Sequence, residues 1–567
     1  MSNRLFGTLV ILMALFCSFK SGGQDMNLRH RWVYIQTNLL VDKNVESVIS
    51  LLERSAGAGY NGIVIADSKF MRWDNLPSKY AENARKVREA CRRLGLDFIP
   101  CVFPIGYSDD LLSRDPNLAE GLPVIDAPYI IQNGKIVPDD ENISIANPGF
   151  EQYDGNTPAG WGFVDQPGKI SFIDKETKYE GSASLRMQDI GTYDPQYGHG
   201  RAHQKIKVRP FTYYHVSVAV KTQDFDAVDQ IQIAILASGA SLNYYKPRIE
   251  KTQDWKQVDI TFNSLEFSEV NLYLGVWEGK GGTLWWDDLQ IEPAGLVNVL
   301  RREGTPLRMT SEDGKIFYEE GVDFDHIHDP KLGNVPWAGS FSVWHEQPEV
   351  SITTNGRLRD GQRLLVSYYH PALIYDGTVM CCMNEPKVYE ILRWQAQRVK
   401  DSLDPDGYFM SHDEIRAQGW DKSCENKLPG QTLAENARKC IAILSQTDPG
   451  KPVFVWSDMF DPYHNAKKSG RYYLVKGDGP WYGSWEGLSK DVIIVNWNSQ
   501  KNERVPSMSH FASRGHKQIL AGYYDGDPKS ILEWLRDAKG IDGIIGVMYT
   551  TWQHNYDDLE DFAELIK

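Results

Sequence analysis

The stretches RWVYIQTNLL (Arg31–Leu40), YNGIVIA (Tyr60–Ala66) and LDFIPCVF (Leu96–Phe103) decide the fold class of this chain. Each is a short apolar run rich in β-branched, aliphatic and aromatic residues. Amphipathic helical patterns over Val45–Ser55 and Lys79–Leu94 separate them. Strands that alternate with helices in this way predict parallel strands covered by helices.

The same rhythm returns toward the C-terminus. Helical patterns recur over Pro386–Leu403, Leu433–Gln446, Lys529–Ala538 and Leu559–Ile566. Five further apolar runs are expected to be strands: Gly407–His412, Pro452–Ser457, Val492–Trp497, Gln518–Tyr524 and Gly543–Thr550. Three strands and five strands make eight, so the chain is predicted to be an α/β protein with a (β/α)8 TIM barrel whose third connection is greatly expanded.

The expanded connection has a different pattern. From Asn147 to Pro293, short alternating strands are separated by Gly, Pro and Asp turns, which is typical of an antiparallel β-sandwich. The segment begins with NPGFE (Asn147–Glu151) and ends with WWDDLQIEP (Trp285–Pro293), and GW at Gly160–Trp161 lies between them. These features resemble the jelly-roll carbohydrate-binding modules of families 4, 9 and 22, and the resemblance implies that the segment binds glycans.

The same resemblance implies a structural calcium ion near the two ends of the sandwich, with Glu151 and Asp287 or Asp288 as its ligands. The alternative is that these three are ordinary turn and edge carboxylates. For catalysis no cofactor is expected, because the chain contains no P-loop, dinucleotide fingerprint or H-E-x-x-H motif.

The N-terminus carries a secretion pattern. Arg4 precedes the apolar run Leu5–Phe16, and the small residues Ser21–Gly23 follow it. This run is too short to span a bilayer and predicts a signal peptide, with a lipid anchor at Cys17 as the alternative, so the protein is expected to be secreted or periplasmic, or to be a cell-surface lipoprotein. The predicted domains are a signal peptide (1–23), a first barrel part (27–110), the β-sandwich (143–294), a β-rich connection (296–375) and a second barrel part (376–567).

Charge and cysteine usage narrow the function classes. The 567 residues include 61 Lys and Arg against 76 Asp and Glu, a net charge of -15, which argues against binding nucleic acid or an anionic membrane. Six cysteines follow Cys17, and none forms a C-x-x-C pair. That spacing argues against a structural zinc site and leaves one or two disulfides open in an oxidising compartment.

The most specific motif is SHDEIR, Ser411–Arg416, directly after an expected barrel strand. TIM-barrel chemistry lies at the carboxyl ends of the strands. Where the strand pleat is lost, both Asp413 and Glu414 can turn toward the barrel mouth, and two close carboxyls should raise the pKa of one of them. A helix N-terminal acidic pair is the alternative for such a dipeptide, but its position among aromatic and acidic strand ends favours an acid–base pair.

SHDE, together with the preceding MNEPKVYEIL (Met383–Leu392) and the later VFVWSD, VIIVNW and LAGYYD runs, resembles glycoside hydrolase family 20, the β-N-acetylhexosaminidases, and their relatives in family 123. The resemblance implies a retaining exo-acting enzyme. In it Glu414 protonates the glycosidic oxygen, and Asp413 orients the acetamido group of the substrate, which attacks the anomeric carbon. The family's double glycine before the acidic pair is absent, and Gln553 stands where the family often has an acid.

Further substrate-binding residues are expected at the strand ends and in the long loop. They are Arg31, Asp67, His370, His412, Trp456, Asp458, Trp497, Tyr523, Tyr524, Asp525 and Trp552. Their indole and phenol faces would stack on sugar rings, and their polar groups would bind hydroxyls.

Two alternatives stay open. A glycosidase for another sugar would use Asp458 or Asp525 as nucleophile. A non-catalytic glycan-binding surface protein would use the barrel only as a scaffold.

Overall fold

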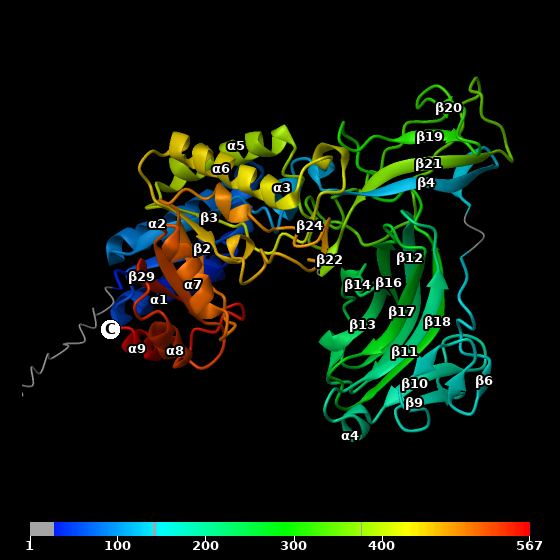
Figure 1. Cartoon of the computed structure of the whole chain (residues 1–567), viewed down its shortest axis with the longest axis horizontal. Helices are drawn as coiled ribbons and strands as arrows, with labels where there is room; N and C mark the ends of the chain where they lie inside the picture. Colours follow the sequence, from blue (N-terminus) through cyan, green and yellow to red (C-terminus); the bar gives the residue numbers. More distant parts are fainter. Residues whose placement is uncertain (1–27, 140–142, 376) are drawn as a thin grey trace, which may run out of the picture.

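The structure is a computed structural model that describes residues 28–139, 143–375 and 377–567. It has two lobes, a barrel with its helices and a β-rich lobe that leaves and rejoins the barrel on one side (Figure 1). The expected signal peptide (1–23) and Cys17 lie outside the described residues. No helix within the described ranges has the length and apolar character to cross a membrane.

Eight parallel strands close into a barrel, with β29 returning to pair with β1. In chain order the strands are β1 (His30–Gln36), β2 (Gly62–Ala66), β3 (Asp97–Val102), β23 (Tyr408–Met410), β25 (Val453–Trp456), β27 (Ile493–Asn496), β28 (Gln518–Tyr523) and β29 (Ile544–Thr550). Each expected strand run overlaps one of them, so the eight-stranded parallel barrel is confirmed.

Alternation along the strands divides the core into two layers. In β2, Val64 packs inside the barrel, whereas Ile63 and Ile65 point outward to the helices. Both faces of a parallel barrel strand are buried, which explains why these strands are continuous apolar runs in the sequence.

Helices cover the outside of the barrel, but the described residues hold fewer of them than the eight of a complete (β/α)8 barrel. They are α1 (Asp42–Ala58), α2 (Ser78–Leu94), α5 (Pro386–Leu403), α6 (Pro429–Thr447), α7 (Arg504–Ser513), α8 (Ser530–Asp537) and α9 (Leu559–Leu565). Between β25 and β27, the described chain has the 3-10 turns η6 (Asp458–Phe460) and η7 (Ser484–Gly487) in place of an α-helix. Figure 1 shows α5 and α6 together along one side of the barrel.

The β-sandwich consists of two five-stranded sheets, ordered β16-β12-β18-β10-β9 and β14-β13-β17-β11-β8. All its pairings are antiparallel, as the turn-rich pattern predicted. The strands are β8 (Phe163–Val164), β9 (Ser171–Asp174), β10 (Ser184–Gln188), β11 (Gly200–Lys207), β12 (Tyr213–Gln223), β13 (Ile231–Ala237), β14 (Ala240–Ser241), β16 (Gln253–Asn263), β17 (Glu269–Val276) and β18 (Thr283–Pro293).

A third sheet, ordered β20-β19-β21-β4-β5, joins the two lobes. It combines β4 (Gly121–Gln132) and β5 (Lys135–Pro138), which precede the sandwich, with β19 (Arg308–Ser311), β20 (Phe317–Tyr318) and β21 (Arg363–Pro371), which follow it. The domain boundaries predicted from the sequence did not group these strands into one sheet, because the strands come from segments before and after the sandwich. Short elements complete the lobe and the loops: α3 (Asp109–Leu112), α4 (Ile190–Tyr193), β6 (Tyr153–Asp154), β7 (Thr157–Pro158), β15 (Tyr244–Tyr245), β22 (Ile374–Tyr375), β24 (Ala417–Gln418) and β26 (Leu474–Val475).

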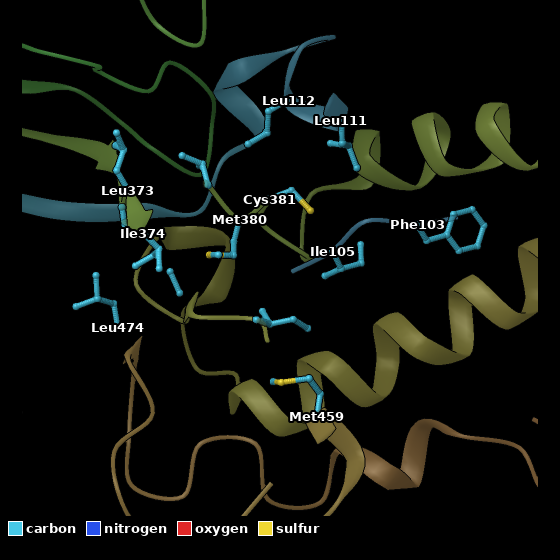
Figure 2. Packing of buried hydrophobic residues seen from close by; sticks show 14 of the residues in the cluster. Phe103, Ile105, Leu111, Leu112, Leu373, Ile374, Met380, Cys381, Met459 and Leu474 are labelled. Atoms are coloured by element: carbon cyan, nitrogen blue, oxygen red, sulfur yellow. The ribbon is translucent and has the colours of Figure 1, made fainter. Parts of the chain in front are cut away.

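The expanded connection is rooted in the barrel by apolar packing. Figure 2 shows Leu111 and Leu112, where the chain leaves the barrel, next to Cys381 from where it returns, with Met380 beside Cys381. All of these side chains are buried in one cluster that also includes barrel residues. The loop after β3 is therefore held against the barrel mouth before the sandwich begins.

Candidate active site

A pocket of about 540 Å³ opens at the carboxyl ends of the barrel strands. Gln36, Ala66, Val102 and Trp456 are the last residues of β1, β2, β3 and β25, and all four line it. Asp413 and Glu414 line it as well. The acidic pair and the strand ends thus meet at the place where a parallel barrel presents its ligand site.

The acidic pair sits where β23 has ended. Met410 is the last strand residue, and Glu414 has a left-handed backbone with φ of 48°, so the strand pleat no longer separates the two side chains. The neighbouring loop after β3 packs closely on this turn, because Ile105 N–H donates to Ser411 O at 3.1 Å. Gly106 lies so near the Asp413 carbonyl that a Cβ there would be 1.7 Å from its oxygen.

Asp413 lies in an environment that favours its neutral form. Burial, then the negative charges of Asp458 and Glu414, raise the pKa of Asp413 to about 8. A carboxyl with a pKa raised in this way favours its protonated form at neutral pH, and burial contributes more to this than the neighbouring carboxylates do.

Glu414 has the opposite surroundings. Arg416 forms an ion pair with its carboxylate, and the Tyr107 hydroxyl donates a hydrogen bond to the same oxygen. Arg416 also donates to Tyr107 Oη at 3.1 Å and lies over the rings of Tyr107, Tyr375 and Tyr473. The two carboxyls thus differ in their partners, because Glu414 is bound by a cation and a hydroxyl donor, whereas Asp413 is buried beside two other carboxyls.

Asp458 stands behind the pair and not on the pocket wall. Its Oδ2 accepts from Glu414 N–H at 3.0 Å and from Asn465 Nδ2 at 2.9 Å, and its Oδ1 accepts from Trp497 Nε1 at 3.1 Å. It is fully buried, and burial raises its pKa to about 6. With its oxygens engaged in this way, Asp458 positions Glu414 and Trp497 and does not present a free oxygen to a substrate.

Aromatic side chains form much of the pocket wall. Trp456, Trp497 and Trp552 all line it, as expected from the strand ends. Trp456 is 2% exposed and Trp552 is 39% exposed, so the first is largely core and the second is open to a ligand. Tyr524, directly after β28, stacks on Trp497 with ring centroids 6.0 Å apart, but it does not itself line the pocket, which corrects its expected role.

Asp67 lines the pocket, but its carboxylate also organises the loops around it. Its Oδ2 accepts from Leu39 N–H at 2.8 Å and its Oδ1 from Lys69 N–H at 3.0 Å. Burial raises its pKa.

Three expected substrate residues lie elsewhere, which corrects their assignment. Arg31 is at the amino end of β1, where its Nε donates to Gly59 O at 3.0 Å, so it faces the opposite end of the barrel. His370 is buried between the third sheet and the sandwich, stacked on Tyr213 and 3.0 Å from Asn263 Nδ2. His412 is buried on the helix side of its strand end, with Nε2 2.9 Å from Asn436 Oδ1.

Two residues near the end of β28 also do not line the pocket. The Tyr523 hydroxyl donates to Asp558 at 2.9 Å, on the outer face of the barrel. Asp525 accepts from the backbone N–H groups of Trp552 and Gln553 and from the Thr551 hydroxyl, so it fixes the loop that carries Trp552.

The proposed calcium ligands are only partly brought together. Glu151 and Asp287 both lie 3.6 Å from an ideal Cβ on Gly149. Asp287 accepts N–H groups of Tyr179 and Asp288, whereas the Asp288 carboxylate turns to Gln290. Asp288 is therefore not at the shared position, and calcium at Glu151 and Asp287 stays a prediction.

Sequence reasoning missed Tyr34, Gln36 and Tyr107 on the pocket wall. Tyr34 and Gln36 are two apart on β1, so they share its inner face, and that spacing was a usable signal. Tyr107 follows β3, but nothing in the sequence showed that the β3 loop lies against Ser411, because β3 and β23 are adjacent only in the barrel.

Comparison with known proteins identifies one part of the chain. Residues 142–280 match the family described as Carbohydrate binding domain. This match supports the interpretation that the protein is glycan-related. It agrees with the resemblance drawn from the first and last residues of the sandwich segment. No curated protein matches the chain.

Several solved structures are similar in part. One described as "CBM4 structure and function" shares 20% identity over 26% of this chain and 99% of its own, with a TM-score of 0.20. A Family 16 Carbohydrate Binding Module-2 shares 13% identity over 26% and 98%, with a TM-score of 0.19. Eubacterium rectale Amy13B shares 8% identity over 93% and 67%, with a TM-score of 0.32. These scores are too low to carry a functional argument.

Proposed function

We propose that this chain is an exported glycoside hydrolase with a TIM-type barrel. The observation that carries the proposal is the pairing of a buried Asp413, whose pKa is raised, with an arginine-bound Glu414 on the wall of an aromatic pocket. Glycoside hydrolysis needs a proton for the leaving oxygen and negative charge for the oxocarbenium-like transition state, and such a pair can supply both. The carbohydrate binding domain would hold the polymer near the barrel. Export rests on the pattern of residues 1–23.

The finer proposal is a retaining β-N-acetylhexosaminidase that uses the substrate's own acetamido group. Support comes from the SHDE resemblance and from the positions of Asp458 and Asp525, neither of which lines the pocket. If these two carboxylates do not reach the sugar, the attacking group has to come from elsewhere, and an acetamido oxygen meets that need.

Two assignments of the proton donor follow from different evidence. The family resemblance makes Glu414 the acid and Asp413 the group that orients the acetamido. The contacts favour Asp413 as the carrier of the proton in the ligand-free protein. Activated aryl glycosides separate the two, because an acidic leaving group departs without protonation and rescues only the variant that lacks the acid.

The first experiment measures chromophore release from aryl N-acetyl-β-hexosaminides whose leaving phenol is weakly acidic and therefore still needs protonation. Glu414→Gln and Asp413→Asn should each reduce turnover by about 10²–10⁴-fold. Glu435→Gln, at an exposed position on α6, is the matched control and should keep wild-type turnover. Unchanged activity in both site variants would remove the acidic pair from the mechanism.

A second candidate function, a non-catalytic glycan-binding protein, is favoured by the fact that the matched family is a binding domain. It predicts that the chain retains glycans, releases no product over long incubation and responds to neither site variant. A glycosidase for another sugar is the remaining alternative, and trapping a fluorosugar on Asp458 or Asp525 would establish it.

A further inference from the structure

Four potential metal ligands converge beside the barrel mouth, outside the pocket. Glu120 precedes β4, Cys382 lies shortly before α5, and Asp421 and Cys424 lie in the loop after β24. All four are buried, and one ligand atom from each lies within 4.8 Å of the others.

The distances within this cluster match the edges of a tetrahedral site. Zn–S bonds of about 2.3 Å and Zn–O bonds of about 2.1 Å place two sulfurs about 3.8 Å apart and a sulfur and an oxygen about 3.6 Å apart. The two thiol sulfurs are 3.6 Å apart. Cys382 Sγ is 3.7 Å from Asp421 Oδ1, and Cys424 Sγ is 3.5 Å from Glu120 Oε2.

The surroundings hold these ligand atoms in place. Asp421 Oδ2 is paired with Arg302, so its Oδ1 is the oxygen that faces the sulfurs. Glu120 Oε1 accepts from Trp420 N–H at 2.9 Å, and this bond holds the carboxyl with both oxygens within 3.6 Å of Cys424 Sγ. Outer contacts of this kind orient ligands in metal sites.

Amide groups point at one of the sulfurs. Gln418 Nε2 and Asn384 Nδ2 lie 2.9 and 3.2 Å from Cys424 Sγ and donate hydrogen bonds to it, which holds the sulfur in place. Gln418 is fully buried, and its Oε1 has no hydrogen-bond partner. Glu120 forms no ion pair with Lys or Arg anywhere in the described ranges, and a buried carboxylate without a countercharge is costly. A bound cation supplies that charge.

We propose that Glu120, Cys382, Asp421 and Cys424 form a structural site for a thiophilic divalent cation of the zinc class. Four protein ligands in a buried position describe a closed structural site, and two sulfurs with two oxygens suit the borderline character of zinc. The ion would tie the start of β4 and the return of the expanded connection to the loop that follows Arg416. It therefore acts on the active site only by positioning. The missing C-x-x-C argued against zinc, but these ligands come from three separate segments, where spacing rules do not apply.

The test uses the full chain, purified with reduced thiols and reconstituted with zinc or cobalt. We expect about one metal ion per chain by elemental analysis, and a cobalt–thiolate charge-transfer band for the cobalt form. Cys382→Ala and Cys424→Ala should abolish both signals. Cys440→Ala is the matched control, because Cys440 is a buried thiol outside the cluster, and it should keep both signals. Chelation should lower the thermal midpoint of the wild type, and added zinc should restore it.

Two results would overturn the proposal. One is a folded, reduced wild-type chain that takes up neither metal. The other is an intact mass and peptide map showing a Cys382–Cys424 disulfide in the protein as isolated, which would assign the two cysteines to a covalent bridge. If the cysteine variants do not fold, the metal content and cobalt spectrum of the wild type still decide. None of these readouts depends on glycosidase activity, so failure of the proposed function would leave them unaffected.

Discussion

Replacing Gly106 by alanine should displace the acidic pair without touching either carboxyl. An ideal Cβ on Gly106 would lie 1.7 Å from the Asp413 carbonyl oxygen. Even a close carbon–oxygen contact is about 3.3 Å, so one backbone has to move by about 1.6 Å. The φ of Gly106 lies outside the left-handed region, so the effect is steric and not conformational.

The size of the effect follows from that displacement. Overpacking of a tight contact costs about 1–3 kcal/mol of folding free energy. A shift of about 1 Å in reacting groups reduces turnover by about 10²-fold. Because the Asp413 carbonyl belongs to the turn that carries both carboxyls, Gly106→Ala should lower stability modestly and turnover strongly.

The assay compares thermal unfolding and aryl-glycoside turnover of Gly106→Ala with those of Gly57→Ala. Gly57 is a helical residue in α1 with nothing within 4 Å of an ideal Cβ. Alanine there should gain about 0.5–1 kcal/mol and leave turnover unchanged. If Gly106→Ala keeps both wild-type stability and wild-type turnover, the close packing of the β3 loop on the acidic pair is refuted.

Further predictions concern protonation and the aromatic wall. Because the pKa of Asp413 is raised, the native state holds a proton that the unfolded chain releases. The stability that this group contributes is therefore complete below about pH 4 and is lost as the pH rises through about 8. In denaturant titrations over that range, the wild type should lose stability relative to Asp413→Asn. Trp552→Ala should weaken glycan binding by about threefold to tenfold in calorimetric titrations while lowering the thermal midpoint less than Trp456→Ala does, because Trp552 is 39% exposed and Trp456 only 2%. Trp456→Ala should cost about 3–5 kcal/mol in chemical unfolding, because its ring is packed inside the barrel against Tyr34 and Phe409; equal effects of the two tryptophan variants on stability would contradict this division.

The barrel strands were predictable because their signal is local. Pro386–Leu403 was expected as a helix and is α5 with the same bounds, since Pro at its first position and the apolar spacing both lie within the segment. The strand runs were equally clear, because both faces of a parallel barrel strand are buried. By contrast, α7 was missed, and β4 and β21 were not paired in advance, since their partnership spans the whole sandwich.

The acidic pair was predictable because it is contiguous and directly follows a strand. The contacts that distinguish its two carboxyls were not predictable from the sequence. Arg416, quoted in the same motif, turned out to pair with Glu414, and Tyr107 joined them from a loop that is distant in the sequence. The residues that were wrongly expected in the pocket failed for a different reason, since their place depends on topology and not on local sequence. Arg31 and His412 stand at strand ends, but which end of the barrel, or which side of a strand end, they occupy is decided by topology.

The sequence by itself determined the barrel strands and most of their helices, the sandwich and its resemblance to glycan-binding modules, and the location of the SHDE motif, because each depends on neighbours in the chain. Only the tertiary structure decided which carboxyl is buried beside other negative charges and which is paired with arginine. It also brought Glu120, Cys382, Asp421 and Cys424 to one point. Such proximity depends on how distant segments pack, and the spacing of residues along the chain does not predict it.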